Sequence, residues 1–368
     1  MFHRVPTVPQ ILHKGPSVRP RHHVRLSHEA AGKSQAGRIS GAGLRAWIWG
    51  GPGLGQLLLK AGGAGEGGHG CAMSPKTVLI TGCSSGIGLA LAVRLAKDKQ
   101  NVSRSGALAA AAGPALGQTL EIKQLDVCDE GSIRACLDSI PGRHVDILVS
   151  NAGVGMAGPL ECQSLAAMQS LMDTNFFGLV RLVKEVLPDM KRRRGGHIVV
   201  ISSIMGLQGI VFNDIYAASK FAVEGFCESL VVQALRFNVA ISLVEPGPVT
   251  TEFEVKLYEE AERADYSRTD PETADIFTNL YLRNSKDIFA SLGQSPEDIH
   301  TLRVIEAARP PFRHQTNAAY TPMAALKHAD PSGALMTDAF YKLVFKYDAV
   351  LRLSLRAIRL VLVCGCLA

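Results

Sequence analysis

Ser203, Tyr216 and Lys220 are the residues whose types and spacing best suit proton transfer. Tyr216 and Lys220 lie four positions apart, which is one helical turn, so their side chains share one face of a helix. A phenol normally titrates near pH ~10, and an ammonium group one turn away favours the phenolate and lowers that pKa. A hydroxyl such as that of Ser203 can orient the carbonyl or alcohol that exchanges a proton with Tyr216. Because Tyr-x-x-x-Lys is also common on solvated helix faces, the surrounding elements decide whether this is a site.

A dinucleotide-binding turn is predicted upstream of these residues. Residues 77–81 form a short β-branched and apolar run typical of a buried parallel strand, and residues 89–96 have the composition of a helix. Between them, Gly82 permits a tight turn, Gly86 lets a pyrophosphate approach the backbone, and Gly88 lets helix and strand pack closely. The helix N-terminus would offer free N–H groups to the phosphates. A flexible Gly/Ser loop is the alternative, and the flanking strand and helix argue against it.

The first 72 residues differ in composition from the rest of the chain. Residues 1–72 carry nine Lys or Arg against two Asp or Glu, a net charge of +7, whereas the whole chain carries +6, so residues 73–368 sum to about −1. The basic pI therefore gives no indication that the folded part binds nucleic acid. Residues 1–72 show neither strand alternation nor a helical period. We expect a disordered, basic, Gly-rich extension, with a mitochondrial transit peptide as the alternative.

From Met73 onward, strands and helices are predicted to alternate. Further strands are expected at residues 120–127, 145–150, 197–202 and 239–244, and helices at residues 164–190 and 214–236. In doubly wound sheets, ligands bind at the carboxyl ends of the strands. The candidate residues at these ends are Gly82, Asp126, Asn151, Ser203 and Pro246. The sequence therefore predicts an α/β fold, a Rossmann-type doubly wound parallel sheet with helices on both faces, over residues 73–330.

Several of these motifs together resemble those of the short-chain dehydrogenase/reductase family. They are Thr81-Gly82-x-x-x-Gly86-x-Gly88, Asn151-Ala152-Gly153, Ser203, Tyr216-x-x-x-Lys220 and Pro246-Gly247. The resemblance covers about residues 74–325. Within the family, the chain looks most similar to the branch that contains retinol dehydrogenases and 17β-hydroxysteroid dehydrogenases, at residues 81–88, 175–178, 200–209, 212–214 and 244–253. The closer likeness is to the retinol dehydrogenases, at residues 191–194, 205–209, 309–311 and 364–366.

The resemblance implies a role for each motif residue. Tyr216 would be the general acid in carbonyl reduction and the general base in alcohol oxidation; Lys220 would lower its pKa and hold the nicotinamide ribose, and Ser203 would bind the substrate oxygen. Asn175 would anchor a water in a proton relay, and its alternative role is to cap or pin a helix. Asp126 would contact the adenine amine of the cofactor, and its alternative role is to cap the next helix. The cofactor would contact Gly82, Ser84, Ser85, Gly86, Ile87, Gly88, Asp126, Val127, Asn151, Ala152, Gly153, Tyr216, Lys220, Pro246, Gly247, Val249 and Thr251.

The stretch between Thr81 and Asp126 departs from the family pattern, because it is shorter than in relatives of this branch. The shortfall lies in residues 97–106, where the second strand and the residue that selects NAD or NADP belong. Residues 101–105 are polar and low in β-propensity, so we expect the second strand to be missing or degraded. Either residues 98–105 form a poor strand, or the chain is a variant with damaged cofactor binding, because unpaired buried amides cost roughly 1–3 kcal/mol each.

The expected cofactor is NADP(H), which follows from the resemblance, with Ser84, Ser85 and Arg104 as candidate contacts of its phosphates. The substrate lid would span about residues 251–330, a mixed helical and polar region. Apolar pocket candidates near the catalytic residues are Met156, Ile204, Met205, Leu207, Val211 and Phe212. Such a pocket suits an apolar alcohol or ketone but does not separate a retinoid from a steroid, and ordinary core packing is the alternative.

The C-terminal residues 331–368 predict an amphipathic tail. Residues 351–363 interleave aliphatic residues with three arginines on one helix face, which is typical of a helix that lies on a membrane surface. Cys364 and Cys366 are candidates for S-acylation, and a terminal helix docked on the core is the alternative. The eight cysteines lack metal-ligand spacing, which predicts no metal site and a reducing compartment.

The resemblance implies that the chain is an NADP(H)-dependent oxidoreductase that interconverts all-trans-retinal and all-trans-retinol. It would be associated with the cytoplasmic face of a membrane, or else cytosolic, with no nucleic acid partner. The alternatives are a 17β-hydroxysteroid (estradiol) dehydrogenase and a catalytically impaired variant that acts as a non-enzymatic binding form. The sequence leaves the oligomeric state open, and the resemblance implies that a homodimer would use the helices at residues 164–190 and 214–236.

Overall fold

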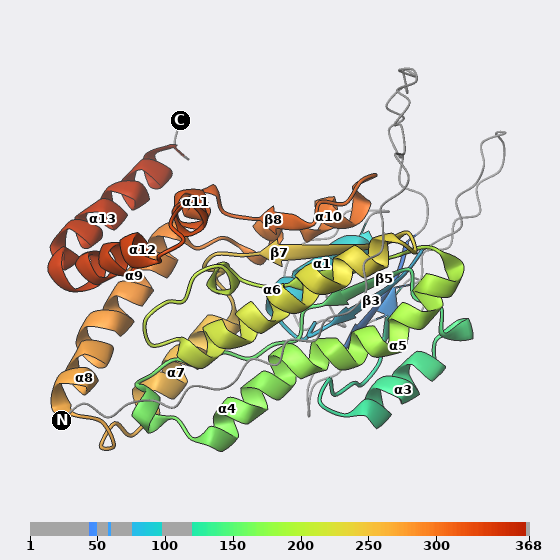
Figure 1. Cartoon of the computed structure of the whole chain (residues 1–368), viewed down its shortest axis with the longest axis horizontal. Coiled ribbons are helices and arrows are strands. Elements are labelled where there is room, and N and C mark those ends of the chain that lie inside the picture. The colour runs from blue at the N-terminus through green and yellow to red at the C-terminus, as the bar shows by residue number, and fades with distance from the viewer. Residues whose placement is uncertain (1–43, 50–57, 60–75, 98–119, 366–368) are drawn as a thin grey trace, which may run out of the picture. The chain divides into compact units, whose positions relative to one another are not determined.

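The computed structural model describes residues 44–49, 58–59, 76–97 and 120–365. All of them belong to the unit Gly41–Ala368, and the separate unit Met1–Ser40 lies outside the described residues. Within these residues, eight strands form one sheet in the order β2-β4-β1-β3-β5-β6-β7-β8 (Figure 1). The strands are β1 (Leu44–Trp49), β2 (Leu58–Leu59), β3 (Lys76–Thr81), β4 (Leu120–Ile122), β5 (Ile147–Ser150), β6 (Gly196–Ile201), β7 (Val239–Glu245) and β8 (Arg313–Gln315). β2 is antiparallel to its neighbours β1 and β4, and the other pairings are parallel.

Helices connect the strands from β3 onward, as predicted. Between β3 and β7 lie α1 (Gly86–Lys97), α3 (Glu130–Asp138), α4 (Leu165–Met172), the π-helical η4 (Asp173–Phe177), α5 (Gly178–Arg193) and α6 (Asp214–Leu235). After β7 follow α7 (Glu252–Arg263), α8 (Pro271–Asp275), the π-helical η6 (Ile276–Tyr281), α9 (Leu282–Leu292) and α10 (Thr301–Glu306). After β8 come α11 (Thr321–Ala329), α12 (Ala334–Tyr341), the π-helical η9 (Lys342–Lys346) and α13 (Asp348–Gly365).

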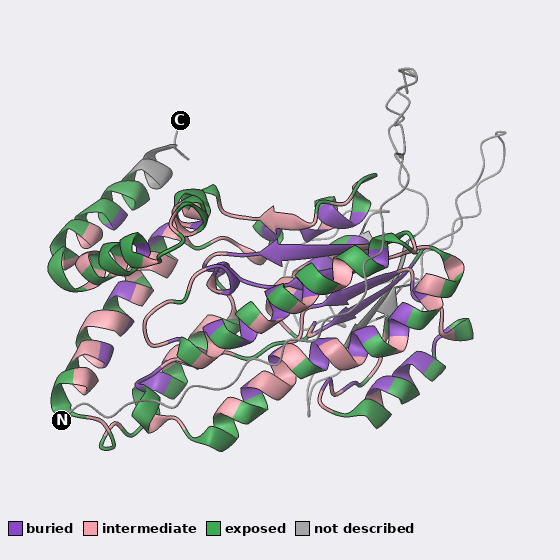
Figure 2. Ribbon diagram, viewed as in Figure 1, coloured by how far each residue is buried: buried purple, intermediate pink, exposed green. Residues whose placement is uncertain are grey.

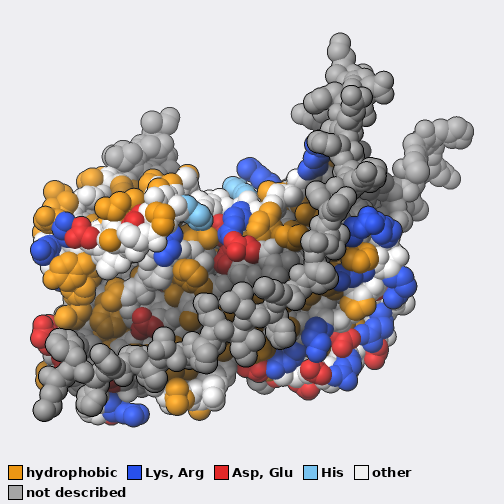
Figure 3. All heavy atoms as spheres, viewed as in Figure 1, with side chains coloured by type: hydrophobic (Ala, Val, Ile, Leu, Met, Phe, Trp, Pro, Cys, Tyr) orange, Lys and Arg blue, Asp and Glu red, His pale blue; other side chains and the backbone are white. Residues whose placement is uncertain are grey.

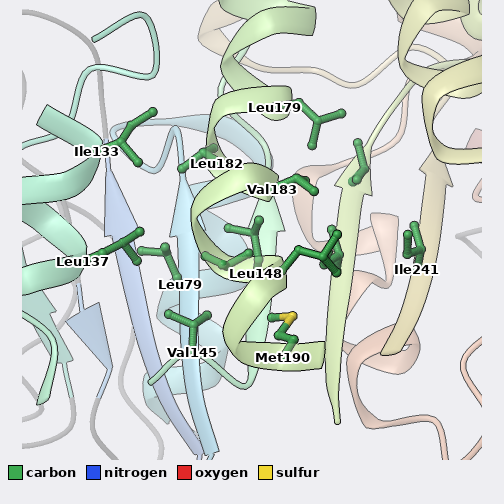
Figure 4. Packing of buried hydrophobic residues seen from close by; sticks show 14 of the residues in the cluster. Leu79, Ile133, Leu137, Val145, Leu148, Leu179, Leu182, Val183, Met190 and Ile241 are labelled. Atoms are coloured by element: carbon green, nitrogen blue, oxygen red, sulfur yellow. The ribbon is translucent and has the colours of Figure 1, made fainter. Parts of the chain in front are cut away.

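Successive strand residues point to opposite sides of the sheet, and a core cluster buries each of the two faces. On one face, Leu79 of β3 and Leu148 of β5 pack with Leu182, Val183 and Met190 of α5 (Figure 4). The cluster on the other face joins strand residues to α1 and α10, and it includes Val78, Ile80, Val149, Leu91, Leu95, Val304 and Ile305. Figure 2 shows the resulting pattern of buried strands between helices that are exposed on their outer sides. The predicted doubly wound α/β fold is confirmed.

The sheet position between β3 and β4 is filled by β1. β1 pairs with β3 along its whole length, from Leu44 opposite Lys76 to Trp49 opposite Thr81, and with β4 at Ala46 and Ile48. This is the position where the sequence analysis expected a missing or degraded second strand. The stretch proposed for that strand, residues 98–105, lies outside the described residues. A strand from the leading segment therefore closes the sheet at this point.

Two expectations differ from the structure on this side of the sheet. We expected disorder over residues 1–72, whereas β1 and β2 are strands; Leu44–Trp49 is rich in aromatic and aliphatic residues that suit a pleated surface. The rest of residues 1–72 lies outside the described residues. We also expected a strand over residues 120–127, whereas β4 ends at Ile122. Residues 123–126 have no regular structure, a turn follows at residues 127–128, and the Asp126 N–H donates to Ser132 Oγ at 2.9 Å.

The C-terminal helix α13 docks on α9 through its first turn. The Asp348 carboxylate accepts hydrogen bonds from Asn284 Nδ2 at 2.8 Å and from Arg283 Nη2 at 3.0 Å. Leu355 of α13 is buried, whereas Val350, Leu353 and Leu360 are 58, 69 and 65% exposed. The predicted helix is confirmed, and it combines a docked side with an exposed apolar side. Among the helices of the described part of the chain, none has the length and apolar character that crossing a bilayer requires.

Candidate active site

Ser203, Tyr216 and Lys220 come together at the carboxyl end of β6. Ser203 lies two residues after the end of β6, and its hydroxyl accepts the Met205 N–H at 3.1 Å. Tyr216 and Lys220 lie in the first turns of α6, and the Tyr216 hydroxyl is hydrogen-bonded to Ser203. Lys220 Nζ lies 5.7 Å from the centroid of the Tyr216 ring and donates to the Ile201 carbonyl at 3.0 Å. Tyr216 and Lys220 on one face of α6 therefore lie together with Ser203 after β6, as the sequence predicted.

Burial dominates the protonation of this group. It raises the pKa of Tyr216 to about 12, while the hydrogen bond with Ser203 acts in the opposite direction. Burial lowers the pKa of Lys220 to about 8, and the charge of Glu224 opposes that shift. The expectation that Lys220 lowers the tyrosine pKa is therefore not met in the protein alone, because desolvation of the phenolate has the largest influence on that pKa. Tyr216 carries its proton at neutral pH, which suits a proton donor.

Asn175 links the loop after β5 to the turn that carries Tyr216. It is buried in η4, the π-helical turn between α4 and α5, a type of irregularity that is frequent at functional sites. Its side chain exchanges two hydrogen bonds with the Val154 backbone, at 2.8 and 2.9 Å, and donates to Ser219 Oγ at 3.1 Å. Ser219 Oγ in turn donates to the Tyr216 carbonyl at 2.7 Å. The Asn175 amide therefore fixes the backbone around Tyr216.

The glycine-rich turn has the geometry that a phosphate-binding loop requires. Gly82 and Gly86 have positive φ angles of 69° and 60°, which side-chain-bearing residues rarely adopt. A Cβ on Gly88 would lie 2.5 Å from the Gly82 carbonyl oxygen, so only glycine fits there. Asn151 Nδ2 holds the turn by donating to the carbonyls of Thr81 (2.9 Å) and Gly82 (2.8 Å). Because α1 begins at Gly86, its free N–H groups face this turn, which fits a dinucleotide pyrophosphate.

The remaining cofactor candidates lie beside this turn or at neighbouring strand ends. The Thr251 methyl group is 3.3 Å from where a Cβ on Gly86 would lie, so the loop after β7 faces the glycine turn. The Asp126 carboxylate accepts the Cys128 N–H at 2.8 Å, and the N-cap of α3 is Asp129, so Asp126 does not cap that helix. The other candidates at these ends are Ser84, Ser85, Ile87, Val127, Ala152, Gly153, Pro246, Gly247 and Val249.

Aromatic residues of the lid cover Tyr216. The Phe253 ring, in α7, lies 6.1 Å from the Tyr216 ring, and a Cβ on Gly155 would be 2.8 Å from the Phe253 ring. Phe212 packs edge-on against Phe277 and Tyr281 at 5.1 and 5.4 Å. Of the predicted pocket residues, Ile204 and Leu207 are buried, Met156 and Met205 are half-buried, and Val211 lines an open surface groove beside the start of α6. The region above the phenol is therefore largely apolar.

Sequence reasoning missed Phe253 and Gly155 as parts of this wall. Phe253 stands between two glutamates in a segment that appeared polar. Its position two residues after Thr251, at the start of the lid, was the signal that could have identified it. Glu224 and Arg313, which lie behind Lys220, were also missed, because nothing in the sequence indicates that a residue of β8 reaches α6.

Comparison with known proteins identifies the family. The family model described as short chain dehydrogenase matches residues 76–262. Retinol dehydrogenase 8 of Bos taurus is 56% identical over 305 residues, which cover 80% of this chain and 96% of that protein. The 17-beta-hydroxysteroid dehydrogenase type 1 of Homo sapiens is 42% identical over 287 residues, with coverage of 74% and 87%. A short chain dehydrogenase/reductase from Burkholderia phymatum, solved in complex with NAD, superposes with a TM-score of 0.55 at 26% identity, covering 68% of this chain and 92% of that one. The chain therefore belongs to the short-chain dehydrogenase family.

Proposed function

We propose that this oxidoreductase interconverts all-trans-retinal and all-trans-retinol with NADP(H). The observation that carries the proposal is the 56% identity with a retinol dehydrogenase over nearly the whole length of that protein. The apolar wall formed by Phe253 and the aromatic cluster around Phe212 supports it, because an apolar polyene aldehyde would be well accommodated there.

In this reaction the chain's own residues handle the proton. The bound nicotinamide would supply or accept the hydride at the reacting carbon. For reduction, the Ser203 hydroxyl would hold the carbonyl oxygen while Tyr216, protonated at neutral pH, gives its proton to that oxygen. Oxidation would run the same transfer in reverse. Lys220 would hold the ribose hydroxyls, and Asn175 would anchor the water that restores the proton of Tyr216.

The glycine turn, Asn151 and the loop after β7 would hold the cofactor, and the end of β1 supports NADP(H) over NAD. In Rossmann folds an acidic residue after the second strand binds the ribose 2′-hydroxyl and disfavours a 2′-phosphate. Here Trp49, the last residue of β1, lies opposite Thr81, which directly precedes Gly82. In the sequence, the four residues after Trp49 contain no carboxylate.

Paired turnover assays test the substrate. With NADPH, we expect kcat/KM for all-trans-retinal to exceed that for estrone by about tenfold or more, the range that pocket shape alone provides for apolar substrates. The human steroid dehydrogenase at 42% identity makes estrone the appropriate competitor. A higher kcat/KM for estrone would favour the steroid alternative, and the same assays with NADH would test the cofactor.

We further propose that α12, η9 and α13 dock on a membrane surface. Exposed apolar side chains gather at the left end of Figure 3, where Figure 1 places α12 and α13. They include Leu335, Tyr341, Leu343, Phe345, Tyr347, Val350, Leu353 and Leu360. Basic residues stand among them, namely Lys342, Lys346, Arg352, Arg356 and Arg359. This combination is typical of interfacial helices, and the cytoplasmic leaflet and S-acylation of Cys364 or Cys366 would suit it.

Vesicle co-sedimentation tests this surface. We expect the full chain to bind phosphatidylserine-containing vesicles, and the triple variant Val350→Ser, Leu353→Ser, Leu360→Ser to bind about tenfold more weakly or worse, since each side chain contributes apolar burial. Leu165→Ser is the matched control, because Leu165 of α4 is 74% exposed but lies outside this surface. Equal binding by the triple variant and the wild type would contradict the proposal.

We also propose that the chain forms a homodimer through α4 and α6. These helices expose Leu165, Phe221, Val232 and Leu235, which are 74, 40, 71 and 66% exposed. A second copy of the chain would cover these exposed apolar side chains where they form a contiguous patch.

A further inference from the structure

Glu224 lies one helical turn beyond Lys220 on α6, and both side chains are buried. Glu224 is 4% exposed, and it accepts a hydrogen bond from the Ser202 hydroxyl. Lys220 itself donates to the carbonyl of Ile201 at 3.0 Å. Two side chains of α6 therefore hold two consecutive residues at the end of β6, immediately before Ser203. The position of the Ser203 hydroxyl depends on both contacts.

Arg313 connects this pair to the neighbouring strand. Its Nη1 lies 2.6 Å from Glu224 Oε2 and also contacts Glu245, and its Nη2 contacts Glu228. Glu245 ends β7 and directly precedes Pro246, whose carbonyl accepts the Ile204 N–H at 2.9 Å. The arginine thus ties α6, β7 and the loop after β6 together behind the active site.

The surrounding backbone leaves room for the Glu224 side chain. A Cβ on Gly206 would lie 2.8 Å from Glu224 Cγ and 2.9 Å from Ser202 Oγ. Gly206 ends the short 3₁₀ helix η5 (Ile204–Gly206), so a larger residue there would displace either the carboxylate or the strand end. The site is built around a buried carboxylate at this position.

Charged and titratable groups from three elements face Glu224. They are Lys220, Cys227 and Glu228 on α6, Glu245 on β7 and Arg313 on β8. Burial raises the pKa of Glu224, whereas the hydrogen bond from Ser202 and the charge of Arg313 lower it. The Glu224 charge in turn raises the pKa of Lys220, against the effect of burial. Removing that charge would let Lys220 lose its proton at lower pH.

We propose that Glu224, held by Ser202 and Arg313, is a positioning residue that keeps Lys220 charged and fixes the end of β6 at Ser203. Glu224 acts through Lys220 and touches neither substrate nor cofactor. The inference rests on the proposed roles of Lys220 and Ser203. It is independent of which apolar carbonyl compound is the substrate.

The test is the pH dependence of NADPH binding and of turnover in variants of the full chain. In Glu224→Gln, we expect the alkaline fall in NADPH affinity and in kcat to move to lower pH by about one unit. Glu224→Asp keeps the charge and should retain the wild-type profile even where its Tm falls. Glu228→Gln removes an exposed carboxylate from the same arginine, and its profile should match the wild type. Ser202→Ala removes the donor to Glu224 and should shift the profile in the same direction by less; this arm decides the question if Glu224→Gln does not fold.

An unchanged pH profile in Glu224→Gln, whatever its Tm, would overturn the proposal, because a purely structural role changes stability alone. An equal shift in Glu228→Gln would also overturn it, since the effect would then belong to the total charge near Arg313. NADPH binding requires no retinoid, so a shifted binding profile supports the inference even if retinal is not turned over.

Discussion

A Tyr216→Phe variant is expected to lose about 10²–10⁴-fold in kcat for retinal reduction, the usual contribution of a positioned general acid. Tyr216 is the phenol hydrogen-bonded to Ser203, and burial keeps its proton in place with a pKa of about 12. Phenylalanine keeps the ring that packs against Phe253 and removes only the transferable proton. Steady-state kinetics with retinal and NADPH, together with NADPH titration, measure the effect, and NADPH affinity should change little.

Tyr266→Phe is the matched control for this substitution. Burial also raises the pKa of Tyr266, and its hydroxyl donates to the Ala261 carbonyl at 2.5 Å within the lid. This variant should lose stability through the missing hydrogen bond, by about 0.5–1.5 kcal/mol, with little loss of kcat. If Tyr216→Phe retained full activity, the proposed proton transfer would be wrong.

Local patterns predicted most of the fold and the polar residues of the site. Gly82, Gly86 and Gly88 are required because backbone segments of one turn lie too close together for side chains. The structure shows this directly, since a Cβ on Gly88 would lie 2.5 Å from the Gly82 carbonyl oxygen. Strand ends place Asn151 and Ser203, because parallel strands deliver their carboxyl ends to one edge. Both the turn and the strands are specified by residues that are neighbours in the chain.

The features that sequence reasoning missed depend on contacts between distant residues. Glu224 and Arg313 are separated by 89 positions, and only the pairing of β7 with β8 brings them together. The pKa of Tyr216 was also predicted in the wrong direction. The spacing to Lys220 reveals the favourable charge, but it does not reveal how far the phenol is removed from water, and here that burial is the larger effect.

The pairing of β1 leads to the second large expected effect. Ile48 lies opposite Ile80 of β3 and Ile122 of β4, so β1 is an internal strand with partners on both edges. An Ile48→Pro substitution removes a backbone donor there, and proline is not tolerated in internal strands. We expect a loss on the order of 2 kcal/mol or more, as the lost bond and displaced neighbours leave buried backbone groups unpaired.

The loss of folding free energy should be larger when β1 is removed altogether. A chain that begins at Met73 would lack β1 and β2, and several unpaired ladder groups would cost a large part of the ~5–15 kcal/mol that stabilises a domain. We therefore expect it to have a strongly lowered Tm and to bind NADPH weakly or not at all, since β3 carries the glycine turn.

A chain that begins at Gly41 keeps β1 and is the matched control, with wild-type Tm and affinity expected. If the chain from Met73 matched the wild type in both measurements, β1 would have no role in the sheet. If the wild type itself bound no NADPH up to millimolar concentration, the chain would instead be the impaired form. Full binding by the wild type and the chain from Gly41, with loss in the chain from Met73 and in Ile48→Pro, would show that the leading segment replaces the second strand of the dinucleotide-binding fold.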